Sequence, residues 1–135
     1  MPNLTHTQVQ EMIRITNSRH DVDEIDGGLR DLGSHRFEDR SLAAQVDMFI
    51  EWNPRFNGYA ETLSDGVNAL NNASQVLTWP EHRRLLSQFR TELQAARIEL
   101  YWRRNMLNNW YRALNEEERD MVKIRYNAVN SGRRW

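Results

Sequence analysis

The sequence predicts an all-α fold: a helical bundle built on a long antiparallel helical hairpin, with short N-terminal helices and one C-terminal helix. Apolar side chains recur at alternating spacings of three and four residues through most of the second half, which is typical of a buried helix face. No segment alternates polar and apolar residues with the period of two that strands show. The six glycines and three prolines are few and lie mostly at plausible helix ends.

We therefore expect a single α-helical domain over residues 1–135. It divides into short acidic helices (1–58), the helical hairpin (59–114) and a basic C-terminal helix with its tail (115–135). A chain of this length buries a substantial core without further domains.

The first expected helix covers about residues 7–18. Thr5 and Gln8 form a capping box at its start, in which each side chain bonds a free amide of the first turn. Apolar residues then follow at helical spacing on one face. We expect this helix to be short and separate from the next.

The acidic stretch HDVDEIDGG (residues 20–28) has two interpretations, a calcium loop or the start of a second helix over residues 21–32. A calcium loop needs oxygen ligands at positions 1, 3, 5 and 12. A loop starting at Asp21 has Leu32 at position 12, and one starting at Asp23 has Ser34 there. Neither residue is a bidentate carboxylate, so we favour a helix capped by Asp21, with no metal site.

A third helix is expected to start after Ser41, whose hydroxyl is a good N-cap. Its apolar positions include Leu42, Val46 and Ile50. Proline lacks the amide that continues a helix, so Asn53-Pro54 is expected to end it.

The hairpin is expected to consist of helices 59–78 and 80–114, with Thr78, Pro80 and Glu81 forming the start of the second. At about 1.5 Å per residue the second helix spans about 52 Å and the first only about 30 Å. About 20 Å of the long helix would then need another partner.

Asn115 is expected to cap a last helix over about residues 116–129, ended by Gly132. The segment LNEEER (114–119), followed by Ile124-Arg125-Tyr126, resembles the opening helix of the DNA-binding region 4 of bacterial sigma factors. In that family a helix-turn-helix of about thirty residues follows and reads the major groove. Nine residues follow Tyr126 here, so the DNA-reading element is not expected.

The junction Trp79-Pro80-Glu81 is similar to the turn of the secreted Trp-x-Gly helical hairpins. The glycine of that family is replaced, and no Tyr-x-x-x-Asp/Glu signal follows the long helix. The secretion function of the family is therefore not expected.

The net charge of −1 conceals a strong asymmetry between the two halves. Residues 1–79 have six arginines and twelve acidic residues, a net charge of −6, whereas residues 80–135 have twelve basic and seven acidic residues, a net charge of +5. Either the halves pack together and neutralise one another, or the basic half faces an acidic partner or a second copy. Both interpretations remain open at this stage.

We expect a cytoplasmic protein that neither spans nor binds a membrane. The chain has no cysteine, no long apolar run, and no basic or apolar stretch at its start. Its composition, 39% hydrophobic and 27% charged, is that of a globular chain. Bacterial or phage origin fits these features.

An enzyme is not expected, and neither a cofactor nor a metal. The four histidines (His6, His20, His35 and His82) are scattered and share no helical face. No glycine-rich phosphate loop and no Gly-x-Ser-x-Gly elbow occurs.

The strongest candidate site is an interaction surface on the long helix. Trp, Tyr and Arg dominate interface hot spots, and they cluster here with one core leucine, in the set Tyr101, Trp102, Arg103, Arg104, Leu107, Trp110, Tyr111 and Arg112. Arg103 interrupts the apolar seam and is expected to pair with an acid from the N-terminal half, snorkel at the bundle edge or fix the register of a dimer.

From this cluster and the unmatched length of the helix we expect a non-catalytic interaction protein, such as an adaptor, assembly factor or inhibitor. Its expected partners are a second copy, forming a homo-oligomer (a dimer), a larger protein, or both. The alternative is a nucleic-acid-associated regulator that acts through the basic half, because bases stack on aromatic rings and guanidinium planes.

Overall fold

The computed structural model describes residues 3–34 and 36–130. Four α-helices follow one another, joined by short connections: α1 (His6–Ser34), α2 (Leu42–Val76), α3 (Pro80–Ala113) and α4 (Glu116–Asn130). A short 3-10 helix, η1 (Phe37–Asp39), lies between α1 and α2. Within the described ranges there is no strand, and no helix combines the length and apolar character that crossing a bilayer requires.

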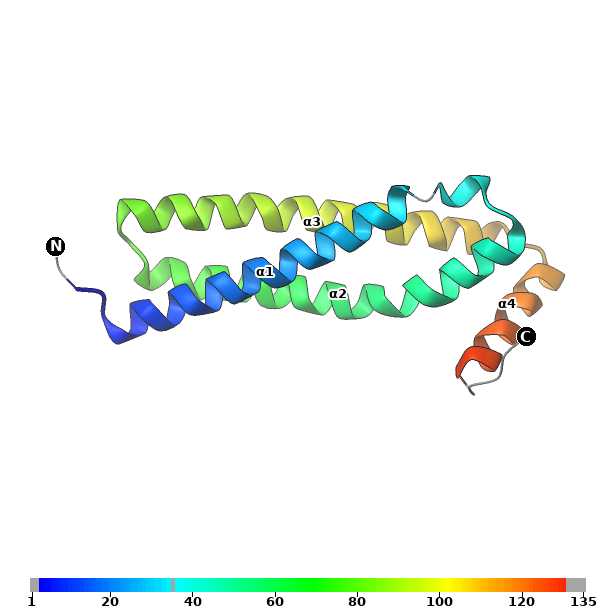
Figure 1. Cartoon of the computed structure of the whole chain (residues 1–135), viewed down its shortest axis with the longest axis horizontal. Helices are drawn as coiled ribbons and strands as arrows, with labels where there is room; N and C mark the ends of the chain where they lie inside the picture. The colour runs from blue at the N-terminus through cyan, green and yellow to red at the C-terminus, as the bar shows by residue number, and fades with distance from the viewer. Residues whose placement is uncertain (1–2, 35, 131–135) are drawn as a thin grey trace.

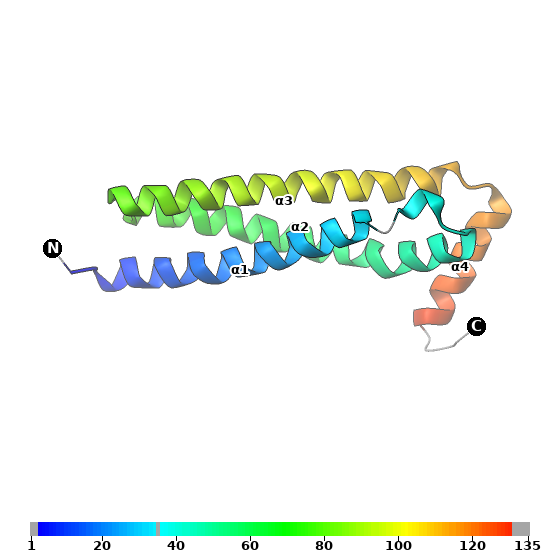
Figure 2. The same ribbon diagram turned by 45° about the horizontal axis from the view of Figure 1, so that its top comes forward.

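The three long helices form an elongated bundle (Figure 1). α2 and α3 run antiparallel beside each other, and α1 packs against both. The fourth helix leaves the end of α3, turns across the end of the bundle and packs against the start of α2 (Figure 2). The all-α helical bundle expected from the sequence is therefore confirmed.

The expected break between the first two helices is wrong, because α1 is one helix of 29 residues. Ile15, Val22 and Leu29 are fully or almost fully buried and lie seven residues apart, so one face of a continuous helix is covered by α2 and α3. Burying each such side chain contributes about 1.5–3 kcal/mol, more than the roughly 1 kcal/mol that each of Gly27 and Gly28 costs. Asp21 is accordingly mid-helix and caps nothing.

The expected stop at Asn53-Pro54 is also wrong. α2 has 35 residues and contains Pro54, an exposed residue on its outer surface. The flanking Trp52 and Phe56 are 8% and 1% exposed. A proline inside a helix costs about 3 kcal/mol, and burying two large aromatic side chains offsets that cost. The N-terminal helices are thus long, not short.

This continuity removes the unmatched length expected of the long helix. α2 and α3 have 35 and 34 residues and are matched along the bundle. The seam of α3, including Leu86, Phe89 and Leu93, is buried by the chain itself. The reason for expecting a second copy along a bare helix end is therefore wrong, although oligomeric state itself stays a prediction.

The helix starts show which local signals act. Thr5 and Gln8 exchange two hydrogen bonds of 3.0 and 3.1 Å, as a capping box does, and Asn115 and Glu118 exchange bonds of 3.0 and 2.9 Å. Ser41 caps α2 by accepting from the amide of Ala44.

At α3 the expected cap is wrong. The N-cap residue is Trp79, without a side-chain hydrogen bond, and Pro80 occupies the first turn as expected. The stop predicted at Gly132 lies outside the described residues.

The core fills the space between the three long helices. Its largest fully buried side chains include Phe56, Phe89 and Leu63. Gly66 lets α2 approach its neighbours closely, since a Cβ there would lie 2.9 Å from Leu93 Cδ2. A second, small cluster of Val46, Ile50 and Val122 holds α4 to the start of α2.

Candidate interaction site

The eight residues predicted as an interface divide into a packed group and an exposed group. Leu107 is fully buried in the core, and Trp110 and Tyr111 are half-buried at the end of the bundle. Tyr101, Trp102, Arg104 and Arg112 are exposed, and Arg103 is half-buried.

Trp110 joins three elements of the chain. Its ring lies edge-on to Phe37 at 5.3 Å and tilted against Phe49 at 5.4 Å, and its Nε1 donates to Gln45 Oε1 at 3.2 Å. A tryptophan with both its ring and its N–H satisfied has little left to offer a partner. Trp110 therefore fastens α3 to η1 and α2.

Tyr111 has a similar internal role. It stacks on Phe49 at 5.2 Å, and the guanidinium of Arg119 lies over its ring at 5.8 Å. Arg119 also donates to the backbone carbonyl of Arg112 at 2.7 Å. These contacts fix the turn between α3 and α4.

Arg103 pairs within the chain, with an acid of its own helix; the partner expected from the sequence was an acid of the N-terminal half. Its Nη2 lies 3.3 Å from Glu99, one turn earlier on α3. Its guanidinium abuts Gly33 at the end of α1, where any larger residue would displace it. Arg103 thus closes the junction between α1 and α3.

Three of the exposed residues join two exposed neighbours, Arg97 and Ile98, in what we call the outer face of α3: Arg97, Ile98, Tyr101, Trp102 and Arg104. The three large apolar side chains are 57%, 63% and 62% exposed, near the middle of the helix and far from its ends. They are three and four residues apart, so they form one continuous patch. Together with Gln94, four of these side chains line a shallow recess: Arg97, Ile98, Tyr101 and Trp102.

Sequence reasoning missed Ile98 and Arg97. Both lie off the heptad seam, between buried positions, and such positions are normally polar and exposed. The signal was present in the sequence, since an isoleucine four residues before a tryptophan on the solvent side breaks the polar pattern expected there.

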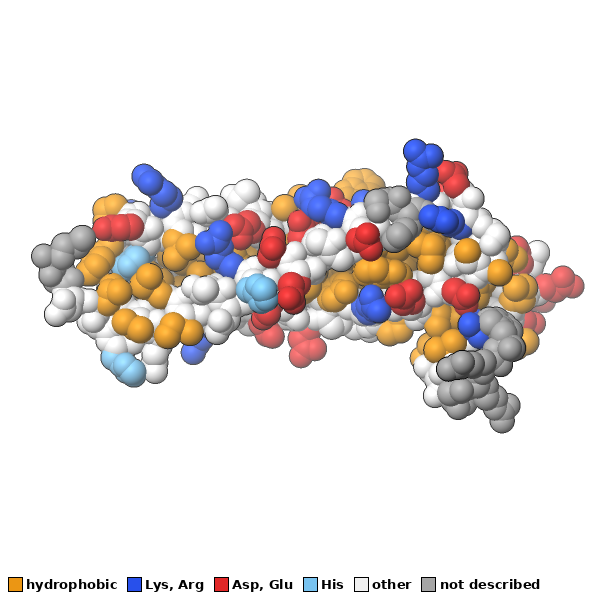
Figure 3. Space-filling model, viewed as in Figure 1, with side chains coloured by type: hydrophobic (Ala, Val, Ile, Leu, Met, Phe, Trp, Pro, Cys, Tyr) orange, Lys and Arg blue, Asp and Glu red, His pale blue; other side chains and the backbone are white. Residues whose placement is uncertain are grey.

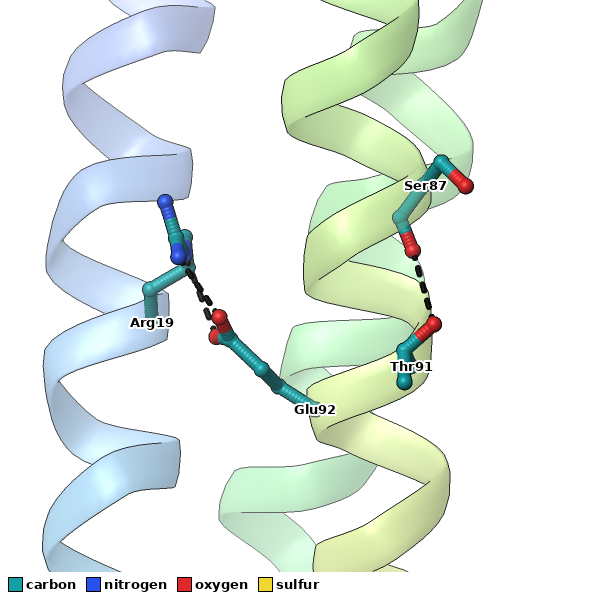
Figure 4. A network of polar contacts seen from close by, with 4 residues as sticks. All are labelled: Arg19, Ser87, Thr91 and Glu92. Carbon is teal, nitrogen blue, oxygen red and sulfur yellow. Dashed lines mark hydrogen bonds and ion pairs between the residues drawn. The ribbon is translucent and has the colours of Figure 1, made fainter.

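Ion pairs join α1 to the opposite flank of α3. Arg19 donates two hydrogen bonds to Glu92, of 3.1 and 2.6 Å, in a bidentate arrangement (Figure 4). The hydrogen bond with Glu92 raises the pKa of Arg19, burial opposes the rise, and the charges of Glu92 and Asp23 support it. Arg30 lies 3.9 Å from Glu99 and 2.8 Å from Asp26, whose hydrogen bond also raises the pKa of Arg30.

If the two halves simply neutralised each other, acids of residues 1–79 would pair with bases of residues 80–135. Two of the observed ion pairs have the reverse arrangement. In Arg19–Glu92 and Arg30–Glu99 the acidic half supplies the base and the basic half supplies the acid. Only Arg125–Asp47, at 2.9 Å, has the expected sense among the three. Packing α1 on α3 therefore uses the acids Glu92 and Glu99 of α3. On the side of the molecule where α1 lies, acidic and basic side chains are mixed on the surface (Figure 3).

The acidic stretch 20–28 is a regular part of α1, so its carboxylates point around a helix instead of into a loop. His20 lies 3.1 Å from Glu24, and Asp26 bonds Arg30. Within the described residues no group of three metal-ligating side chains is found. His82 is buried and stacked on Trp79 at 5.1 Å.

In comparisons with known proteins, the chain matches no family model, no curated protein and no solved structure.

Proposed function

We propose that this chain is a non-catalytic binding protein that docks an acidic protein partner on the outer face of α3. The observation that carries the proposal is the contiguous exposure of Ile98, Tyr101 and Trp102 beside Arg97 and Arg104. An adaptor, assembly factor or inhibitor would act through such a surface.

The energetics favour a binding surface. Tryptophan, tyrosine and arginine are the residue types enriched at hot spots, where truncation costs about 2 kcal/mol or more. Tyr101 and Trp102 contact each other edge-on at 6.1 Å, so their positions are partly fixed before any partner arrives. Little side-chain freedom is then lost on binding.

The chemistry of the partner follows from the flanking charges. A second copy that packed α3 on α3 through this face would bring Arg97 and Arg104 of both chains into one interface, where like charges repel. A partner with carboxylates around an apolar anchor point complements them. We therefore place a different, acidic protein on this face, and self-association becomes an outcome of the test.

The test uses a photoreactive phenylalanine analogue at position 94, an exposed glutamine that lines the same recess, to capture the partner in cells. The captured protein is then purified and titrated against the wild-type chain and against variants. Trp102→Ala and Arg97→Glu should each weaken binding at least about tenfold, equivalent to about 1.4 kcal/mol. Ile13→Ala, a matched truncation of an exposed side chain on α1, should leave the affinity unchanged.

Two results would overturn the proposal. One is a partner whose affinity is insensitive to Trp102→Ala and Arg97→Glu. The other is sedimentation equilibrium at micromolar concentration showing a dimer that Trp102→Ala dissociates, because the face would then be occupied by a second copy.

The second candidate is a nucleic-acid-associated regulator, favoured by the exposed arginines of α3 beside Tyr101. Phosphate contacts predict binding that falls steeply between about 50 and 200 mM salt. A gel-shift assay with single- and double-stranded DNA and with RNA at low salt tests it, and the absence of any shift would exclude it.

A further inference from the structure

Four arginines of α3 are regularly spaced along one flank of the helix, and we call them the arginine ladder. Arg83, Arg90, Arg97 and Arg104 are all exposed and lie seven residues apart. Seven residues are almost two helical turns, so these side chains share one flank of α3 at steps of about 10.5 Å, over about 31 Å in all. Their spacing is that of a heptad.

The facing wall of α2 is uncharged. The stripe with the matching spacing of three and four consists of Asn57, Ala60, Ser64, Val67, Asn71 and Ser74. Arg104 reaches across to donate to Asn57 Oδ1 at 3.4 Å, which sets the alignment of the two stripes.

We call the space between these stripes the open groove. Two recesses lie along it, one between Ala60 and Arg104 and the other between Ser74 and Arg90, and α1 lines neither. No Asp or Glu among the described residues lines them. Two acids, Glu61 and Asp65, directly follow Ala60 and Ser64 in sequence, and each lies a little over a quarter turn around α2 from the residue it follows.

The arginines of the ladder are not compensated. Within the described residues, Arg83, Arg90 and Arg97 form no ion pair, whereas Glu92 and Glu99 of the same helix are engaged on the flank that faces α1. Four like charges along one groove repel one another, and an acidic occupant relieves that repulsion.

We propose that the open groove receives an acidic amphipathic α-helix of the partner, which completes a four-helix arrangement with a carboxylate at every seventh residue facing the arginine ladder. This inference rests on the proposed function, since it names the element that docks beside the outer face. Tyr101 and Arg97 line both the open groove and the recess of that face, so one partner covers both.

A helix fits the groove better than a nucleic-acid strand. The floor is apolar, formed by the buried Leu63 and Leu100 with Ala60 and Val67 beside them. Alanine or leucine side chains of an amphipathic helix would cover this floor, whereas a phosphodiester chain has nothing apolar to place there. The heptad step of about 10.5 Å also matches an aligned helix.

The experiment uses two synthetic peptides of identical composition. The first has four glutamates at every seventh position with alanine and leucine on the adjoining face, and the second has the same residues with the glutamates distributed around the helix. Fluorescence anisotropy should show the first binding the full chain at least about tenfold more tightly. Equal binding of the two would show that the ladder is not recognised and would overturn the inference.

Charge reversal provides the matched variants. Arg90→Glu with Arg97→Glu should weaken the first peptide at least about tenfold, and a peptide with arginine in place of its glutamates should bind this double variant instead of the wild type. Arg84→Glu, the same change at an exposed position off the ladder, should alter binding less than about twofold. Circular dichroism checks that each variant remains helical, and failure of the swapped peptide to bind would contradict the inference.

Two further outcomes distinguish this inference from nucleic-acid binding and from the proposed function. A single-stranded oligonucleotide that binds more tightly than the first peptide, with steep salt dependence, would overturn it in favour of a nucleic acid. If the captured partner requires Trp102 but neither it nor the peptide responds to Arg90→Glu, the helix inference fails while the proposed function stands.

Discussion

The same two helices, α2 and α3, build two grooves with opposite characters. On one side α1 fills the groove, with apolar side chains such as Ile15 and Leu29 buried and Arg19 paired with Glu92. On the other side the open groove has an apolar floor, an uncharged wall on α2 and a ladder of arginines on α3. One groove is satisfied by the chain itself and the other is not.

The difference shows how charge is distributed around a helix. α3 places Glu92 and Glu99 on the flank that meets α1, together with Arg103, whose guanidinium pairs with Glu99. Its four ladder arginines lie on the flank that faces away: Arg83, Arg90, Arg97 and Arg104. Net charge by segment cannot reveal this, because both flanks belong to the same residues 80–113. The comparison predicts that substitutions in the filled groove affect stability and that substitutions in the open groove affect binding.

The largest expected effect comes from the filled groove. Phe89→Ala removes a fully buried ring beside Gly66 and should lower the free energy of unfolding by about 3–5 kcal/mol. Tyr101→Ala, on the open side, should change it by less than about 0.5 kcal/mol. Urea unfolding of both variants measures the contrast, and equal losses would contradict the distinction between the grooves.

The next effect concerns Pro54, on the solvent side of α2. Pro54→Ala restores an amide that can donate to the carbonyl of Ile50 and removes the clash of the ring, so stability should rise by about 1–3 kcal/mol. Thermal unfolding followed by circular dichroism measures the gain. A loss of stability would mean that α2 is not helical through this position.

Two glycines of α2 test the same difference between an open position and a packed one. Gly58 has nothing within 4 Å of an added Cβ, so Gly58→Ala should stabilise the chain by about 1 kcal/mol through helix propensity. At Gly66 the added methyl meets Leu93 Cδ2 at 2.9 Å, so Gly66→Ala should gain less or lose stability. Urea unfolding ranks the two, and a larger gain at Gly66 would contradict the close packing of the filled groove.

The smallest effect concerns the ion pair of the filled groove. Arg19→Ala should lower stability by only about 0.5 kcal/mol, because both partners are about a third exposed and screened by water. The hydrogen bond with Glu92 raises the pKa of Arg19 above its ordinary value. Its contribution to stability is therefore complete below the ordinary pKa of arginine and is lost only as pH rises through the raised pKa. The difference between wild type and variant should therefore stay constant from about pH 7 to 10, as urea unfolding at each pH can check.

The helical pattern predicted much of the fold. The seam from Leu86 to Leu107 and the bounds of α3 follow from heptad spacing, because local periodicity and burial agree there. The breaks placed near Ser18 and at Pro54 were wrong, because glycine, proline and acidic residues were weighed as local signals. Their cost is set against burial by distant helices, which no local pattern contains.

The positions of the candidate residues could be anticipated only in part, for the same reason, and their role in binding stays a prediction. The aromatic and arginine cluster is where sequence placed it, but Trp110 and Tyr111 turn inward to residues sixty or more positions away, Gln45 and Phe49. Which side of a seam is covered depends on where α1 packs. The position of α1 decides which flank of α3 stays exposed, so the open groove and its arginine ladder could not be recognised from the sequence alone.

The attachment of α4 has a consequence for the dynamics of the chain. This helix is held by the small cluster around Val122 and by Arg125–Asp47, at the margin of the bundle (Figure 2). With so little apolar area to expose, α4 should detach as a cooperative unit at a lower free energy than global unfolding, while the three long helices persist. Its amide protons would then exchange earlier than those of α3, giving the molecule two distinct opening events in place of one.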